Sequence, residues 1–281
     1  MLKRFSALLM AALACAGCAN PTHRALAYAQ RSGLAVSIIQ GTRFRHQIFS
    51  ARAARNAGAL DAGMLYVFIE GDGSPWVDDG TKVARDPTPR RPLALELAAA
   101  TPHTVLYVGR PCYFEPRTDA NCTSGLWTYR RYSAEVVAST AAAVARYAAA
   151  NENPPLILIG YSGGGTLAVL MASQLPATRA VVTIAANLDV DAWARWHGYL
   201  PLSSSVNPAT QWPLADSIQQ LHLVGGRDTN VPESVNRRYF EALSPQQIWR
   251  YAEFDHGCCW VEHWTSILAQ IDAATLAGER E

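Results

Sequence analysis

The chain has 281 residues, of which 49% are apolar, and this is the composition of an ordinary globular protein rather than a disordered one. Its 24 basic and 23 acidic residues give a net charge of +1 at pH 7. Because there is no basic excess, the composition indicates neither a nucleic-acid partner nor an anionic membrane surface as the main target. No repeat or long linker interrupts residues 19–281, so we expect a single domain there.

The N-terminus has the form of an export signal. Lys3 and Arg4 precede an apolar run over residues 5–14, and small residues lead to Cys18. The run is too short to span a bilayer as a mature helix. The segment resembles the signal of a bacterial lipoprotein, which implies that 1–18 is the signal region and that Cys18 is lipidated, although Cys15 stands where such signals usually carry leucine. We therefore expect a membrane-anchored lipoprotein of the cell envelope, with periplasmic or secreted protein as the alternative.

Export changes the interpretation of the four remaining cysteines, because an oxidising compartment favours disulfides. These are Cys112, Cys122, Cys258 and Cys259, which permit three pairings. The simplest pairing joins Cys112 to Cys122 within one loop, but it leaves two adjacent cysteines as partners. Cross-pairing between the two segments is the alternative.

Eight short runs rich in branched apolar residues predict strands. They cover 34–39, 44–49, 64–69, 104–108, 156–159, 180–185, 218–224 and 248–254. The first two are close enough to form an antiparallel hairpin, whereas stretches of helical character at 92–100, 132–150, 166–174 and 234–243 separate later runs. The pattern predicts an α/β fold with a mainly parallel sheet of about eight strands and helices on both faces. Functional residues are then expected at the carboxyl ends of the strands.

A candidate nucleophile follows the run at 156–159 directly. Gly160-Tyr161-Ser162-Gly163-Gly164 fits the pattern G-x-S-x-G, and a helical stretch comes next. Small residues two positions either side of a serine allow a very tight strand-to-helix turn, which exposes the hydroxyl above the sheet. A phosphate-binding loop is the competing interpretation, but it requires a lysine after the last glycine and Thr166 follows instead.

A serine hydroxyl needs a histidine to take its proton and a carboxylate to orient that histidine. Asp228 follows the strand predicted at 218–224, and His256 follows the last predicted strand in a short loop with Gly257. Asp189 or Asp191, after the preceding strand, is the alternative acid. The adjacent Asp255 is a poor one, because neighbouring side chains in an extended segment point in opposite directions.

Residue types that can bind zinc are clustered near the C-terminus. His256, Cys258, Cys259, Glu262 and His263 are ligand types, but their spacing does not match a zinc motif, and exported cysteines favour disulfides. We therefore expect neither a metal nor a cofactor.

The order Ser162, Asp228, His256 and the motifs Gly-Tyr-Ser-Gly-Gly, Gly-Gly-Arg-Asp-Thr-Asn-Val-Pro and Asp-His-Gly resemble the α/β-hydrolase superfamily, in its esterase- and lipase-like serine hydrolases. The resemblance implies an α/β-hydrolase fold with these three residues as nucleophile, acid and base. It also implies that the oxyanion is bound by the backbone N–H groups of Gly163 and Asp72. Glu70 replaces the histidine that many members carry in the loop before Asp72.

Aromatic residues near these motifs are candidates for a substrate pocket. We expect Tyr161, Trp76, Trp193, Trp196 and His197 to line it, with the segment around 193–197 forming a short cap. The alternative for this segment is that its rings cover the edge of the sheet as ordinary core.

The predicted function is hydrolysis of a small-molecule carboxylic ester, or a related acyl bond, through an acyl-enzyme on Ser162 by a monomeric enzyme. Thioesterase, peptidase and acyltransferase chemistry use the same groups. A non-catalytic envelope or binding lipoprotein with the same fold is the alternative from a different class.

Overall fold

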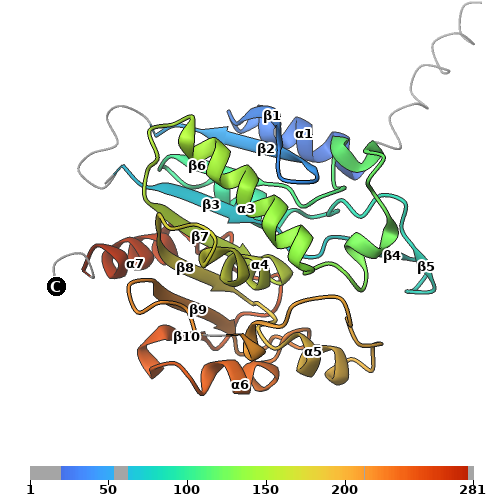
Figure 1. The fold of residues 1–281 in the computed structure, drawn as a ribbon. Helices are drawn as coiled ribbons and strands as arrows, with labels where there is room; N and C mark the ends of the chain where they lie inside the picture. Colours follow the sequence, from blue (N-terminus) through green and yellow to red (C-terminus); the bar gives the residue numbers. More distant parts are fainter. Residues whose placement is uncertain (1–19, 54–62, 212, 278–281) are drawn as a thin grey trace, which may run out of the picture.

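The computed structural model describes residues 20–53, 63–211 and 213–277 (Figure 1). The proposed signal and Cys18 lie outside the described residues. The strands are β1 (Ala35–Gln40), β2 (Arg45–Ala51), β3 (Leu65–Ile69), β4 (Trp76–Val77), β5 (Lys82–Val83), β6 (Val105–Val108), β7 (Leu156–Tyr161), β8 (Thr178–Ile184), β9 (Gln219–Gly225) and β10 (Ile248–Tyr251). The α-helices are α1 (Pro21–Arg31), α2 (Leu93–Ala99), α3 (Ala134–Ala149), α4 (Gly163–Ala172), α5 (Val190–Trp196), α6 (Arg237–Phe240) and α7 (Trp264–Ala277). Short 3-10 helices are η2 (Glu115–Thr118), η3 (Ser124–Trp127), η4 (Pro208–Thr210), η5 (Glu233–Asn236) and η6 (Pro245–Gln247).

Eight of the strands form one sheet in the order β1-β2-β6-β3-β7-β8-β9-β10. The pairs β1–β2 and β2–β6 are antiparallel, and every other neighbouring pair is parallel. The eight predicted strands, the early hairpin and the mainly parallel sheet are thus confirmed. The short ribbon β4–β5 lies outside this sheet.

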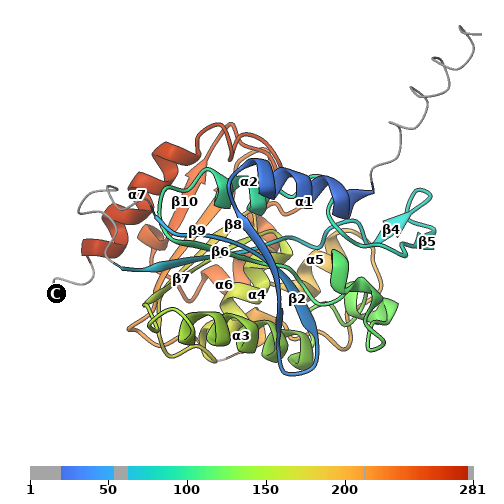
Figure 2. The same cartoon turned by 90° about the horizontal axis from the view of Figure 1, so that it is seen from above.

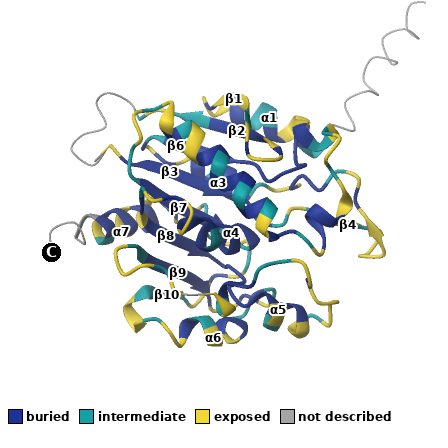
Figure 3. Cartoon of the chain, in the orientation of Figure 1, coloured by how far each residue is buried: buried dark blue, intermediate teal, exposed yellow. Residues whose placement is uncertain are grey.

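Helices cover both faces of the sheet. Figure 2 shows α3 and α4 on one face and α1, α2 and α7 on the other. The central strands β3, β6 and β7 are buried almost throughout, which explains why their sequences are continuously apolar (Figure 3). Parallel strands end at the same edge of the sheet, and this edge carries the loops described below.

The prediction of one continuous helix over 234–243 is wrong. The segment forms η5 and then α6, which has only four residues. The helix α1 was not predicted, although Asn20 caps it by accepting a hydrogen bond from the His23 N–H. Within the described ranges, no helix is long and apolar enough to cross a membrane.

Two disulfides are present, and they follow the simplest of the pairings considered. Cys112 and Cys122, whose Cα atoms are 5.5 Å apart, close the loop after β6. Cys258 pairs with Cys259. The cross-paired alternative is not adopted, so the loop after β6 and the loop after β10 are each closed on themselves.

Two histidines are buried in the core as uncharged groups. His222 on β9 lies 2.8 Å from the Thr183 hydroxyl and packs against the ring of Tyr239, and burial lowers its pKa to about 3. Burial likewise lowers the pKa of His46 to about 4, although its hydrogen bond to the Gly109 carbonyl acts in the opposite direction. In the folded protein both imidazoles therefore stay neutral at a pH where the same histidines in the unfolded chain are protonated.

We predict that His222→Leu weakens the acid sensitivity of folding. Below about pH 6.5 the unfolded chain protonates this histidine and the folded chain does not, so wild-type stability falls with pH by as much as about 1.4 kcal/mol per pH unit from this group. This loss of stability ends only near pH 3, which is about the pKa of His222 in the folded protein. Urea unfolding between pH 7 and 4.5 measures the slope, and an identical slope in the variant would show that His222 is not responsible.

Candidate active site

Ser162 lies at the sharp turn between β7 and α4. Its backbone has φ 52° and ψ −126°, a conformation that costs energy for any residue except glycine. Neighbouring glycines make the turn possible: a Cβ on Gly160 would overlap the Gly164 carbonyl, and a Cβ on Gly164 would overlap the Ile69 carbonyl. The turn therefore packs directly against the end of β3.

Ser162, His256 and Asp228 form a hydrogen-bonded series. The Ser162 Oγ is 3.1 Å from His256 Nε2, and His256 Nδ1 is 2.9 Å from Asp228 Oδ2. The Asp228 carboxylate accepts a hydrogen bond from Nδ1–H, and the tautomer with its proton on Nδ1 leaves Nε2 as the acceptor for the serine hydroxyl. This geometry suits removal of the hydroxyl proton by the imidazole.

The Asp228 side chain is fully buried and uses both of its oxygens. While Oδ2 meets His256, Oδ1 accepts hydrogen bonds from the N–H groups of Asn230 and Val231 at 2.9 and 2.8 Å. The carboxylate thus holds its own loop in place as well as the imidazole. Burial without these partners would be costly for a charged group.

The alternative acids are occupied elsewhere. Asp189 caps α5 by accepting from the Ala192 N–H, and it also accepts from the Asn207 side chain. Asp191 accepts from the same Asn207 amide. Of the three aspartates considered, Asp228 is the one hydrogen-bonded to His256.

The loop that carries His256 is held by a buried tryptophan. The Trp260 indole N–H donates to the carbonyls of Asp255 and His256. The Asp255 carboxylate turns away and accepts from the N–H groups of Gly257 and Cys258. The His256 side chain is 22% exposed, so its imidazole is accessible from solvent.

Asp72 lies at the centre of an ion cluster beside the nucleophile turn. Its carboxylate accepts from Arg110 at 2.6 Å, from Arg131 at 2.7 Å and from the Tyr132 hydroxyl at 2.7 Å, while its carbonyl accepts from the Tyr113 hydroxyl at 2.8 Å. Burial alone would raise the pKa of Asp72, but the positive charges of Arg131 and Arg110 and the hydrogen bonds lower it to about 2. The residue is thus ionised and fixed at both its side chain and its carbonyl.

The backbone beside this cluster approaches Ser162 closely. A Cβ on Gly71 would lie 3.2 Å from the Cβ of Ser162, and a Cβ on Gly163 would overlap the Asp72 carboxylate. Among the described residues, neither the Asp72 N–H nor the Gly163 N–H has a protein acceptor. The two predicted oxyanion donors thus have no hydrogen bond within the described residues, and the loop that carries one of them passes close to Ser162.

Glu70, the departure from the motif of better-known hydrolases, has a structural role in this chain. Its buried carboxyl accepts from the N–H groups of Gly71 and Ala94, both at 3.1 Å, and so joins the loop to the start of α2. Burial raises its pKa to about 7, and the backbone hydrogen bonds limit that rise.

The five residues expected to line a pocket lie in different surroundings. The Tyr161 ring is 5.3 Å from the His256 ring. Trp193 and His197 both donate to the Asn230 carbonyl, at 3.1 and 2.7 Å, in the loop that holds Asp228. Trp76 and Trp196 are 43% and 58% exposed. Pocket lining by these residues stays a prediction.

Sequence reasoning missed the partners of Asp72. Arg110, Arg131 and Tyr132 lie 38 to 60 positions away along the chain, on the loops after β6 and before α3. The only sequence signal is the Gly-Asp-Gly after a buried strand, and it does not say which cations meet the aspartate.

No family model matches the chain, and no curated protein matches its sequence. Its structure is similar to that of the Pyrococcus furiosus esterase Pf2001, with 14% identity, a TM-score of 0.58 and coverage of 88% of this chain and 93% of that one. It is also similar to a membrane phospholipase A described as a bacterial virulence factor, with 16% identity, a TM-score of 0.55 and coverage of 98% and 97%.

A third similar structure is XC6422 from Xanthomonas campestris, described as an α/β serine hydrolase without a lid, with 15% identity, a TM-score of 0.51 and coverage of 88% and 94%. At such identities the similarity concerns the fold and not the reaction. The sheet order and these neighbours establish that the chain has the α/β-hydrolase fold.

Proposed function

We propose that the protein is a serine hydrolase that cleaves a carboxylic ester through an acyl-enzyme on Ser162. The observation that carries the proposal is the series from Ser162 through His256 to the buried Asp228, at 3.1 and 2.9 Å. The names of the similar structures, an esterase and a phospholipase among them, favour an ester bond.

In the first half of the proposed reaction, the Ser162 Oγ attacks the carbonyl carbon as His256 Nε2 takes its proton. The new imidazolium is stabilised by the Asp228 carboxylate. The C–O bond to the alcohol then breaks, and the imidazolium gives its proton to the departing oxygen. Water repeats these steps in the second half and releases the acid and free Ser162.

The oxyanion that forms on the carbonyl oxygen would be bound by the N–H groups of Gly163 and Asp72. Backbone donors that are already fixed in position stabilise such a charge without reorganisation. The ion cluster supports this role, because it holds Asp72 at its carboxylate and carbonyl and leaves its N–H without a protein acceptor among the described residues.

A non-catalytic binding protein is the alternative. Binding alone does not require a serine at φ 52° that is hydrogen-bonded to an imidazole, nor a buried carboxylate that is hydrogen-bonded to that imidazole. Backbone strain of this kind is found mainly where it serves a function, so these features favour catalysis. Thioester and amide cleavage, or acyl transfer, would use the same residues.

Reaction with a fluorophosphonate tests the nucleophile. We expect labelling of the wild-type protein at Ser162, found by peptide mass spectrometry, and none in Ser162→Ala. The exposed Ser203→Ala serves as the matched control and should label like wild type. A folded wild-type protein that does not react would favour the binding-protein alternative.

Arg131→Met tests whether the ion cluster positions the Asp72 N–H. With one cation removed, we expect kcat on a soluble ester to fall by about tenfold to a hundredfold while KM changes little, because the donor acts mainly in the transition state. Arg131→Lys should restore part of the rate. Arg130→Met is the control, since Arg130 pairs with Glu135 instead; equal losses in both methionine variants would assign the effect to general destabilisation.

We also propose that Cys18 carries a lipid anchor. Changing Cys18→Ser should move the protein from the membrane fraction to the soluble fraction of the cells, as judged by immunoblotting. Unchanged retention in the membrane fraction would reject Cys18 as the anchor.

A further inference from the structure

Exposed apolar side chains are concentrated near the proposed active site. The described part of the chain has seven large hydrophobic residues that are exposed, and six of them lie in loops and short elements around one edge of the sheet. These six, which we call the apolar rim, are Trp76, Val83, Tyr129, Trp196, Tyr199 and Leu200, with Leu200 86% exposed. Figures 1 and 2 both place β4, β5 and α5 on the side where the parallel strands end.

Contacts within the protein connect the segments of the rim. The Trp127 indole donates to the Ala84 carbonyl just after β5, and the Ser205 hydroxyl donates to the Tyr129 carbonyl. At one end of the rim, the loop before Trp76 passes beside Ser162. At the other, the ring of Tyr199 stacks on His197, which is bonded to the Asp228 loop. Segments that adjoin the rim therefore contact the site, through Gly71 at one end and His197 at the other.

The described chain begins beside the same rim. The Thr22 hydroxyl, in the first turn of α1, is within 3.4 Å of Asp86 and 3.3 Å of Thr88, in the segment that follows β5. Cys18 precedes Thr22 by four residues, which span at most about 14 Å when fully extended. A lipid on Cys18 would thus hold this side of the protein close to a membrane.

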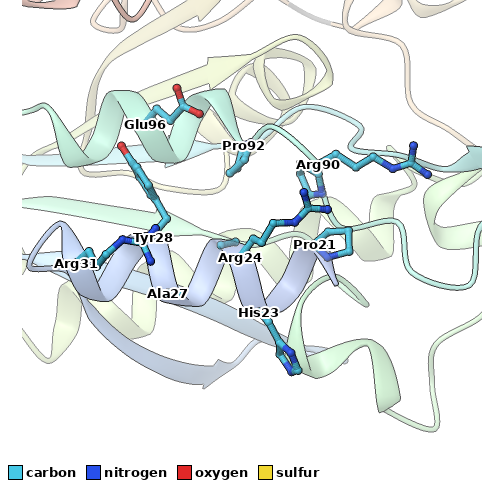
Figure 4. A pocket seen from close by; sticks show the side chains of 11 residues that line it. Pro21, His23, Arg24, Ala27, Tyr28, Arg31, Arg90, Pro92 and Glu96 are labelled. Atoms are coloured by element: carbon cyan, nitrogen blue, oxygen red, sulfur yellow. The ribbon is translucent and has the colours of Figure 1, made fainter. Parts of the chain in front are cut away.

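Two arginines place positive charge near the start of α1, although the net charge of the whole chain is only +1. Figure 4 shows Arg24 on α1 and Arg90, in the segment before α2, on the two sides of a surface groove. Both residues are exposed. Guanidinium groups bind phosphate oxygens well, so this position suits anionic lipid headgroups.

We infer that the apolar rim docks on a phospholipid bilayer, so that Ser162 faces the membrane and receives a lipid ester from it. Exposed tryptophan, tyrosine and leucine with arginines nearby are typical of groups that lie in the lipid interface. The membrane, rather than a second copy or a protein partner, is favoured because the start of α1, which the proposed anchor at Cys18 precedes by a few residues, and the arginines lie on the same side. The substrate part of the inference rests on the proposed esterase activity.

The test compares one enzyme on two substrates: a soluble short-chain ester, and a long-chain ester carried in vesicles of phosphatidylcholine and phosphatidylglycerol. Leu200→Glu and Val83→Glu should lower the rate on vesicles by about tenfold, because each removes apolar contact and places a charge in the interface. Their kcat/KM for the soluble ester should stay within about twofold of wild type. Ile38→Glu, at the exposed apolar residue of β1 outside the rim, should change neither rate.

Arg24→Glu should weaken activity on the anionic vesicles by about fivefold or more and leave activity on pure phosphatidylcholine vesicles unchanged. Unchanged vesicle rates in all the rim variants would overturn the inference. So would a wild-type dimer that Leu200→Glu converts to a monomer without loss of the vesicle rate, since the rim would then be a self-association surface.

Failure of the proposed function gives a different result. In that case the wild type hydrolyses neither ester and Ser162 does not react with a fluorophosphonate. Flotation with the same vesicles, in a Cys18→Ser background so that no lipid contributes, still tests docking: the rim variants must float less than the parent protein and Ile38→Glu must not.

Discussion

The geometry around Ser162 depends on the close approach of three backbone segments, which only glycine permits. The strand-to-helix turn, the end of β3 and the loop after it meet where a Cβ on Gly164 would overlap the carbonyls of Ile69 and Glu70 and a Cβ on Gly71 would lie 3.2 Å from the Cβ of Ser162. This contact lets the serine adopt its strained conformation and brings the Asp72 loop beside it. The positions of His256 and Asp228 then follow from the sheet, because β9 and β10 end at the same edge as β7.

The ion cluster at Asp72 is a second constraint on the same place. Burying Arg110 and Arg131 beside one carboxylate is unfavourable unless their remaining donors are satisfied. Arg110 also donates to the Arg131 carbonyl, and Arg131 donates to the Thr128 carbonyl, whereas the buried Arg110 Nε has no hydrogen-bond partner in the described part of the chain. The cluster therefore ties the segment before α3 to the loop after β3 and fixes Asp72 at the position where we propose that its N–H binds the oxyanion.

Much of this structure is predictable from the sequence, for identifiable reasons. Short runs rich in apolar residues predicted all eight strands of the main sheet, and G-x-S-x-G predicted the turn at Ser162. What could not be predicted depends on contacts between distant residues: the partners of Asp72, the helix-capping role of Glu70, and the apolar rim, whose members are scattered from Trp76 to Leu200. The helix predicted at 234–243 failed because η5 replaces its first turn.

The most direct test of the account is a crystal structure of the protein after reaction with a fluorophosphonate. The account predicts a bond from the Ser162 Oγ to phosphorus and a phosphonyl oxygen within hydrogen-bond distance of both the Gly163 and Asp72 N–H groups. An adduct on another residue, or an oxygen on Ser162 that meets neither N–H group, would contradict it.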